Sequence, residues 1–268
     1  MIGATQLMNE ADAMNQVARR SLLTGLLATP LAVILADPIL RAAAAEGLDT
    51  VSVTTADGRV EKAALAVPAR TPAPAVLLIH QWWGLNDQMK AMAAEFAKEG
   101  FLALAVDLYE GKVASDPTAA KSYMQALQPD QATQTLVAWI NWLKKDPRST
   151  GKVATVGWCF GGGWSLNASI AAPVDATVIY YGQVTRPAAD LARLKGPVLG
   201  QFADKDQWID KKMVAGFEAE MKKAGKPLTV YTYPADHAFV DPTGQNYDKD
   251  ATQLAWGRTL TFLRANLG

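Results

Sequence analysis

The stretch that decides the fold of this chain is Gly157-Trp158-Cys159-Phe160-Gly161-Gly162-Gly163. It follows a β-like run at 153–156 and opens a run with helical character at 164–172. Glycine two residues before and two residues after a nucleophile is typical of a nucleophile elbow, here with cysteine where serine is more usual. The strand and helix crowd that corner and leave no room for a Cβ. The alternative is a glycine-rich turn that merely holds a buried cysteine.

Length and charge limit the classes of function. The chain has 268 residues, half of them apolar, which favours one large α/β domain with a substantial core. Lys plus Arg equals Asp plus Glu at 26 each, so the net charge indicates no nucleic-acid partner and no anionic membrane surface. The single cysteine excludes an internal disulfide.

The N-terminus has the pattern of an export signal. Arg19-Arg20 precedes a moderately apolar run, 26–35, and the small residues 42–45 suit a signal peptidase. Twin arginines in this setting are typical of a Tat-type signal, which exports folded proteins. We predict a signal over residues 1–45 and a periplasmic location. The alternatives are an N-terminal helix of the domain or a membrane anchor, but the run is short for a span, so we expect no stable membrane insertion of the mature chain.

Beyond the signal, the pattern predicts one α/β domain over residues 46–268. An opening hairpin is followed by alternating strands and helices, which indicates a doubly wound, mostly parallel sheet flanked by helices. The hairpin strands are 51–55 and 60–67, and the later strands are 75–79, 101–106, 153–156, 176–181, 197–203 and 228–233. The helices are 86–98, two within 117–145, 164–172, 211–223 and 248–266.

A cysteine nucleophile needs a base, and the base needs a carboxylate that orients it. In chains with such an elbow, the nucleophile comes first along the sequence, then the acid, then the histidine, and each follows a strand. Asp206 follows the strand 197–203, and His237 follows the strand 228–233. Ligands bind at the carboxyl ends of strands in open α/β sheets, so these loops should converge. We therefore predict a triad of Cys159, Asp206 and His237.

Other assignments remain open at this point. Asp204 is a rival for the acid, two residues upstream of Asp206. The only other histidine, His80, precedes the cysteine and ends the strand 75–79, where a packed, hydrogen-bonded side chain is expected. Taken singly, Asp206 and His237 could each be surface residues, but their shared order makes that coincidence much less probable.

The predicted site also needs donors for an oxyanion and walls for a substrate. The backbone N–H of Phe160 is one donor, and the other should come from the loop after the strand 75–79, near Trp82. Tryptophans lie beside these loops at Trp82, Trp83, Trp158 and Trp208. They favour an aromatic pocket that holds little water, although tryptophans also bury large areas in ordinary cores.

Most of the chain after residue 50 resembles the dienelactone hydrolase family of α/β-hydrolases. The markers are Gln81-Trp82-Trp83-Gly84-Leu85-Asn86, Val106-Asp107-Leu108-Tyr109, the elbow, Asp204-Lys205-Asp206 and Asp236-His237-Ala238-Phe239. The resemblance implies the α/β-hydrolase fold, the triad Cys159, Asp206 and His237, and an oxyanion hole from Trp82 and Phe160. It also places Tyr123 in the substrate pocket. The pocket residues that we predict are Gln81, Trp83, Tyr123, Trp158, Trp208 and Phe239.

The chain departs from this family at two places. Gln81 stands where the family usually has a glutamate that takes the thiol proton, and glutamine accepts no proton at neutral pH. Activation of the cysteine must then rest on His237, or the activity is altered. The arginines that would hold a substrate carboxylate line up with Ala119 and Asp241. A neutral or apolar substrate is therefore expected.

Together these features predict a hydrolase of a small-molecule carboxylic ester or lactone, acting through a Cys159 thioester. The pattern implies no cofactor and no metal, because no set of His and Cys ligands is clustered in the sequence. A monomer is favoured, with no nucleic-acid partner. The alternative is a non-catalytic or weakly active binding protein of the same fold, which lost efficient catalytic turnover when Gln81 replaced the glutamate. A thiol sensor is a third hypothesis, and the missing resolving cysteine counts against it.

Overall fold

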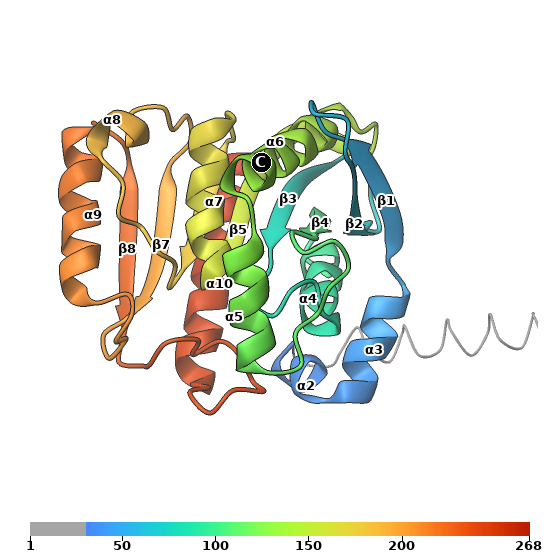
Figure 1. The fold of residues 1–268 in the computed structure, drawn as a ribbon, viewed down its shortest axis with the longest axis horizontal. Coiled ribbons are helices and arrows are strands. Elements are labelled where there is room, and N and C mark those ends of the chain that lie inside the picture. The colour runs from blue at the N-terminus through green and yellow to red at the C-terminus, as the bar shows by residue number, and fades with distance from the viewer. Residues whose placement is uncertain (1–30) are drawn as a thin grey trace, which may run out of the picture.

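The structure is a computed structural model that describes residues 31–268 (Figure 1). Arg19 and Arg20 of the predicted export signal lie outside these described residues. The helices are α2 (Leu31–Ala36), α3 (Pro38–Glu46), α4 (Asp87–Lys98), α5 (Pro117–Ala126), α6 (Pro129–Lys145), α7 (Phe160–Ala171), α8 (Ala188–Leu191), α9 (Lys211–Lys223) and α10 (Lys249–Leu267). The strands are β1 (Asp49–Thr54), β2 (Val60–Ala66), β3 (Ala73–Ile79), β4 (Leu102–Val106), β5 (Ser149–Trp158), β6 (Ala176–Tyr180), β7 (Val198–Ala203) and β8 (Leu228–Tyr233).

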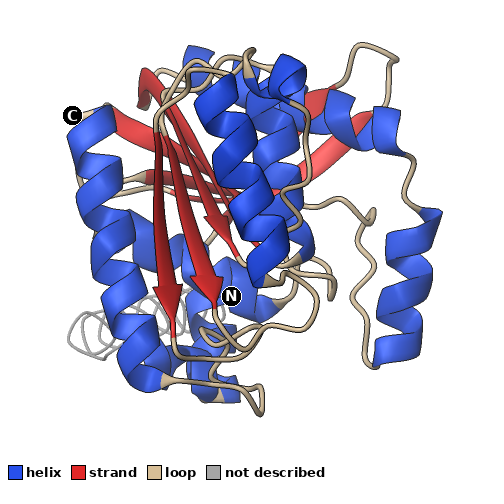
Figure 2. Cartoon of the chain, turned by 90° about the vertical axis from the view of Figure 1, so that its left-hand side faces the viewer, coloured by secondary structure: helices blue, strands red, loops and turns tan. Residues whose placement is uncertain are grey.

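The strands form one eight-stranded sheet in the order β1-β2-β4-β3-β5-β6-β7-β8. β1 pairs antiparallel with β2, and β2 with β4, while all the other pairs are parallel. Figure 2 shows arrowheads of neighbouring strands at the same end of the sheet. The predicted α/β-hydrolase fold, a mostly parallel sheet opened by a hairpin, is confirmed. Because β3, β5, β7 and β8 end at one edge, the loops that follow them meet there.

Helices cover both faces of this sheet, which is why its central strands are apolar throughout. On one face, α2, α4 and α10 pack over inward-facing residues such as Val76, Val156 and Tyr180. On the other face, α6 covers the strands β3 to β5, and α9 covers β6 to β8. The fully buried Trp139 of α6 belongs to this second layer. Burial on both faces holds the strand ends at fixed positions for the loops they carry.

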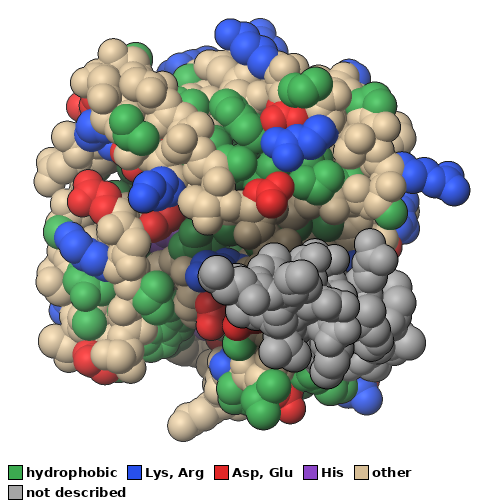
Figure 3. Space-filling model, turned by 90° about the vertical axis from the view of Figure 1, so that its right-hand side faces the viewer, with side chains coloured by type: hydrophobic (Ala, Val, Ile, Leu, Met, Phe, Trp, Pro, Cys, Tyr) green, Lys and Arg blue, Asp and Glu red, His purple; other side chains and the backbone are tan. Residues whose placement is uncertain are grey.

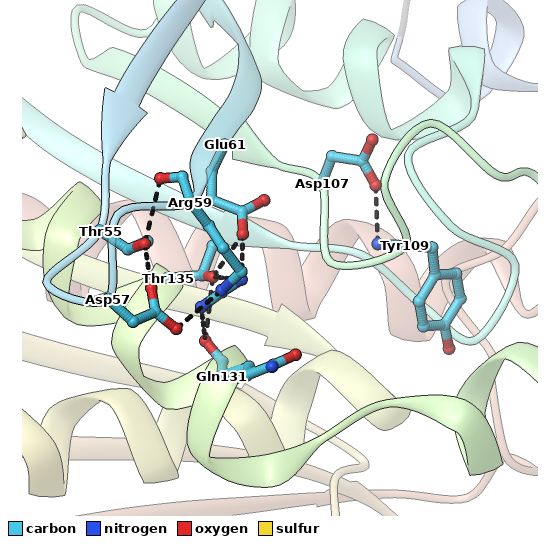
Figure 4. Close-up of polar contacts among 8 residues, drawn as sticks. All are labelled: Thr55, Asp57, Arg59, Glu61, Asp107, Tyr109, Gln131 and Thr135. Atoms are coloured by element: carbon cyan, nitrogen blue, oxygen red, sulfur yellow. Dashed lines mark hydrogen bonds and ion pairs between the residues drawn. The ribbon is translucent and has the colours of Figure 1, made fainter.

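The opening hairpin is tied to α6 through Arg59 (Figure 4). Its guanidinium donates to the carboxylates of Asp57 and Glu61 on the hairpin, and also to the Gln131 carbonyl, 3.1 Å away on α6. Thr135 of α6 also donates to Glu61. One cation thus bridges two elements far apart in the sequence and fixes the antiparallel edge of the sheet.

The C-terminal part of the predicted export signal is helical. Asp37 caps α3, with its carboxylate accepting from the backbone N–H groups of Ile39 and Leu40. Ile34 and Leu35 of α2 are buried in the core layer that also contains α4. This contact does not test removal of the segment, so the boundary at residue 45 stays a prediction.

The surface carries charges of both signs. On the face in Figure 3, basic and acidic side chains are interspersed, without a basic patch among the described atoms. Over residues 31–268, none of the helices combines the length and the apolar character needed to cross a bilayer.

Candidate active site

The predicted elbow is present at the join between β5 and α7. Cys159 lies between these elements with φ 55° and ψ −116°, a conformation that L-residues rarely adopt. A Cβ added to Gly157 would lie 1.9 Å from the Gly161 carbonyl oxygen, and one added to Gly161 would lie 2.1 Å from the oxygen of Ile79. The two glycines are therefore required by close backbone contacts, as the sequence pattern predicted.

The structure brings Cys159, His237 and Asp206 into one hydrogen-bonded line. His237 Nε2 lies 3.1 Å from Cys159 Sγ, and His237 Nδ1 lies 2.6 Å from Asp206 Oδ2. The second carboxylate oxygen of Asp206 accepts from the N–H groups of Trp208 at 2.8 Å and Ile209 at 3.0 Å. Those two bonds aim the carboxylate at the imidazole, which fixes the orientation of the ring.

The rival assignments lie elsewhere. The backbone N–H of Asp204 bonds to Tyr233, and its Oδ1 is buried without a hydrogen-bond partner among the described residues. His80 lies in the core, bonded to Leu108 and Gln81. Of the two acids and two histidines considered from sequence, Asp206 and His237 are the pair that reaches the thiol.

The line of three side chains sets the protonation of its members. Burial lowers the pKa of His237, but its hydrogen bonds to Asp206 and Cys159 and their charges outweigh burial and raise that pKa to about 9. Burial raises the pKa of Asp206, but bonds from His237, Ile209 and Trp208 outweigh it and leave the pKa below its ordinary value. The geometry therefore favours a proton on His237 beside an ionised Asp206.

The two predicted oxyanion donors lie in the loop after β3 and at the start of α7. In residues 31–268, the N–H groups of Trp82 and Phe160 have no hydrogen-bond partner, whereas those of Gly162 and Gly163 bond to the Cys159 carbonyl. Phe160 is the first residue of α7, where free N–H groups and the helix dipole favour negative charge. Both predicted oxyanion donors are thus unoccupied by the protein itself.

Three of the predicted aromatic residues lie at the loops around the triad. The ring of Trp208 is 68 % exposed and meets His237 edge-on at 5.0 Å. Trp82 and Trp83 contact each other, with ring centroids 4.9 Å apart, in the loop after β3. Tyr123 of α5 contacts Tyr109, which in turn contacts Phe160.

Two other predicted pocket residues are core side chains instead. Trp158 is buried, stacks on Tyr180 at 5.5 Å and packs against Phe96 of α4. Phe239 is fully buried against Tyr181 and Tyr233. Both flank site residues in the sequence, but their rings belong to the layer beneath α4 and α10.

Two tyrosines near the thiol were not predicted from the sequence. Tyr181, directly after β6, meets His237 edge-on at 5.0 Å, and Tyr109 lies in the loop after β4. Each hydroxyl is buried without a hydrogen-bond partner in the described part of the chain. Burial, and next the charge of Cys159, raise the pKa of both hydroxyls. Their positions after strand ends are a signal that could have identified them.

The structure also locates Gln81 and Asp241, two positions at which the chain departs from the pattern of the family that it resembles. Gln81 is buried in the loop after β3, two residues beyond the end of the strand. Asp241 is buried, and its Oδ1 accepts from Gln88 Nε2 at 2.8 Å and from the backbone and hydroxyl of Thr243. Asp241 therefore ties the loop of His237 to α4. Among the described residues, no three His, Cys, Asp or Glu side chains group in a way that could hold a metal ion.

Known proteins are similar to this chain in sequence and in fold. The model of the dienelactone hydrolase family matches residues 62–267. The carboxymethylenebutenolidase of Pseudomonas putida is 28% identical over 228 residues, which cover 80% of this chain and 94% of that protein. The protein usf of Aquifex pyrophilus is 32% identical over 205 residues, 72% and 89% of the two chains. A dienelactone hydrolase-like promiscuous phosphotriesterase from metagenomic libraries has a TM-score of 0.75 at 25% identity, covering 82% and 99%.

Proposed function

Because the chain belongs to the dienelactone hydrolase family, and is thus a hydrolase of ester or lactone bonds, we propose that it works through a thioester on Cys159. The observation that carries this proposal is the hydrogen-bonded line from Asp206 through His237 to the thiol, at 2.6 Å and 3.1 Å. Such a line is what nucleophilic catalysis by a thiol requires.

In the first half of the reaction, the proton of the Cys159 thiol rests on His237 Nε2, as the raised pKa of that imidazole favours, and the thiolate attacks the carbonyl carbon. The carbonyl oxygen becomes an oxyanion, which the N–H groups of Trp82 and Phe160 stabilise. The C–O bond to the leaving alcohol then breaks, and His237 gives its proton to that oxygen. The same raised pKa suits His237 to hold the proton until the alcohol leaves.

In the second half, His237 takes a proton from water, which attacks the thioester carbonyl. The same two N–H groups stabilise the second oxyanion. The C–S bond breaks, the acid leaves, and the proton returns from His237 to the thiolate. Asp206 stays ionised throughout, because its pKa is held below the ordinary value, and supports the imidazolium in both halves.

We propose a neutral ester or lactone with an apolar or aromatic part as the substrate. The support is the exposed Trp208 beside His237, together with the Trp82–Trp83 pair in the loop that carries a predicted oxyanion donor. Neutral short-chain aryl esters should have a higher kcat/KM than matched esters that bear a carboxylate. A preference for the carboxylated member of a pair would contradict this substrate class.

The binding-protein alternative rests on Gln81. The direct contact between His237 and the thiol supports catalysis, because it supplies a base without a carboxylate at position 81. In this proposal Gln81→Glu changes kcat modestly, and the wild-type protein already turns over.

We propose that the enzyme acts in the periplasm as a monomer. The location is supported by the twin-arginine segment Arg19-Arg20, which is followed by an apolar run and by Ala42–Ala45. Fractionation of cells that express the full chain, with Arg19→Lys and Arg20→Lys together as the matched control, tests this location. Enzyme in the periplasm for the wild type and in the cytoplasm for the double variant is expected.

The experiment that tests the proposed chemistry is alkylation linked to activity. Iodoacetamide should abolish hydrolysis of p-nitrophenyl acetate with one adduct per chain, on Cys159. Full activity after complete alkylation of Cys159 would show that the thiol is not the nucleophile.

A further inference from the structure

His80 makes two hydrogen bonds that the triad does not use. It follows β3, and its side chain is completely buried, with 0% exposure. The backbone N–H of Leu108 donates to His80 Nε2 at 3.2 Å, and His80 Nδ1 lies 2.5 Å from the carbonyl oxygen of Gln81. Both ring nitrogens therefore face backbone groups, one a donor and the other an acceptor.

These partners fix the tautomer of the ring. A backbone N–H can only donate, so Nε2 carries no proton and the neutral ring has its hydrogen on Nδ1. Nδ1–H then donates to the Gln81 oxygen. Burial lowers the pKa of His80, against smaller raising effects from the Gln81 bond and Asp107, which keeps the ring neutral.

The Gln81 carbonyl belongs to the same peptide unit as the N–H of Trp82. A trans peptide unit is planar, and its C=O and N–H point in opposite directions, so holding the oxygen also sets the direction of the N–H. Gly84 N–H donates to the same oxygen at 3.3 Å. Hydrogen bonds at the oxygen also polarise the unit and strengthen its N–H as a donor.

His80 contacts the second oxyanion residue as well. Its ring stacks on Phe160 with centroids 5.9 Å apart and an interplanar angle of 20°, and meets Tyr109 edge-on at 4.7 Å. One buried ring therefore bonds to the peptide unit that carries the Trp82 N–H, stacks on Phe160, and bonds to the loop after β4.

We propose that His80 is a positioning residue that sets the oxyanion hole, holding the Gln81–Trp82 peptide so that the Trp82 N–H faces the reacting carbonyl oxygen. This inference rests on the proposed thioester mechanism. His80 touches neither the thiol nor the substrate, and its effect is confined to the steps that form an oxyanion.

Two conservative variants separate the two hydrogen bonds. The amide nitrogen of asparagine can occupy the place of Nδ1, so His80→Asn keeps a donor for the Gln81 oxygen and loses the acceptor for Leu108. The amide of glutamine reaches the place of Nε2, so His80→Gln keeps the acceptor and loses the donor. Each variant loses one buried hydrogen bond, which makes them matched controls for stability.

The expected result is a split between kcat and the other properties. For p-nitrophenyl acetate, His80→Gln should lower kcat about tenfold or more, less than complete loss of an oxyanion donor, with KM within about twofold. His80→Asn should keep kcat within about threefold of the wild type. Alkylation of Cys159 by iodoacetamide forms no oxyanion, so its rate should match the wild type in both variants. Equal losses of kcat in the two variants, or a parallel loss of alkylation rate, would overturn the proposal.

A measurement on the unchanged protein covers the case in which a variant does not fold. The chain has two histidines, so ¹⁵N-histidine NMR of the wild type, assigned with His237→Gln, reports the tautomer of His80 directly. A proton on Nδ1, and a ring with a pKa below that of an unperturbed histidine, are expected. A proton on Nε2, or a ring that titrates above the value of an unperturbed histidine, would contradict the proposal. This readout does not depend on activity, so absence of any ester turnover would refute the thioester mechanism alone.

Discussion

His237 Nε2 lies 3.1 Å from Cys159 Sγ, although 78 residues separate the two along the chain. Cys159 follows β5, and His237 lies in the loop after β8, three strands away in the same sheet. Parallel strands that end at one edge make this contact possible, and the strained elbow lifts the thiol toward the loops. In the proposed mechanism, this contact supplies the base that Gln81 cannot.

The first prediction concerns the titration of His237. Its imidazole should titrate at a pKa of about 9 in the folded protein, against about 6.5 for an unperturbed histidine. Asp206→Asn removes the strongest hydrogen bond that raises this pKa and should lower it. Asp204→Asn is the matched control and should leave it in place. NMR of the ring protons measures both, and a response to Asp204→Asn alone would assign the acid wrongly.

The same titration predicts how stability depends on pH. A pKa raised in the folded state means that the folded protein binds the proton more tightly than the unfolded chain. The stabilising contribution of His237 is therefore complete below about pH 6.5 and is lost as pH rises through about 9. Urea unfolding across this window should show the free energy of unfolding falling with pH, and less steeply in His237→Gln. Equal slopes in both proteins would contradict the raised pKa.

The second prediction compares the two histidines. His237→Ala should lower kcat at least ~10²-fold, because it removes the general base from both halves of the reaction. His80→Gln keeps that base and should lose less. Steady-state kinetics with p-nitrophenyl acetate, on variants checked for folding by circular dichroism, makes the comparison. A larger loss at His80 would mean that the base has been assigned to the wrong residue.

The sheet and the order of the triad could be predicted from the sequence because they depend on short-range patterns. The run 75–79 is apolar throughout, as a strand covered on both faces must be, and Asp206 and His237 each follow such a run. Glycines at 157 and 161 mark the elbow because only glycine fits the backbone contacts there.

The walls of the site could not be predicted in the same way. Trp158 and Phe239 are neighbours of Cys159 and His237 in sequence, but their rings pack into the core beneath α4 and α10. Tyr109 and Tyr181 reach the site from other strand ends through loop conformations that no periodicity encodes. Whether a loop side chain faces the thiol depends on φ and ψ, such as the positive φ of Tyr181.

The third prediction concerns the bond between Gln88 and Asp241. Gln88→Leu removes a donor from a buried carboxylate that anchors the His237 loop, which should destabilise the protein by about 1–3 kcal/mol. Lys90→Ala on the same helix breaks only the surface pair with Asp87 and should change stability by less than about 1 kcal/mol. Urea denaturation of both variants measures the difference. Equal effects would show that the Gln88 bond does not hold the loop.

The fourth prediction concerns removal of the predicted signal. Burial of Ile34 and Leu35 contributes about 1.5–3 kcal/mol for each side chain. The conformational entropy lost on ordering α2 and α3, six and nine residues long, opposes that gain. A chain that starts at Glu46 should therefore stay folded, with a Tm close to that of the full-length protein. A large fall in Tm would show that residues 31–45 are part of the domain.

The central claim, a thioester on Cys159, is tested most directly by trapping it. Wild-type protein mixed with p-nitrophenyl acetate and quenched in acid during turnover should show, by mass spectrometry of its peptides, one acetyl group per chain on Cys159. The Cys159→Ala variant should form no adduct and release no p-nitrophenol above the rate without protein. Turnover with the acetyl group on another residue, or undiminished turnover by Cys159→Ala, would contradict the account.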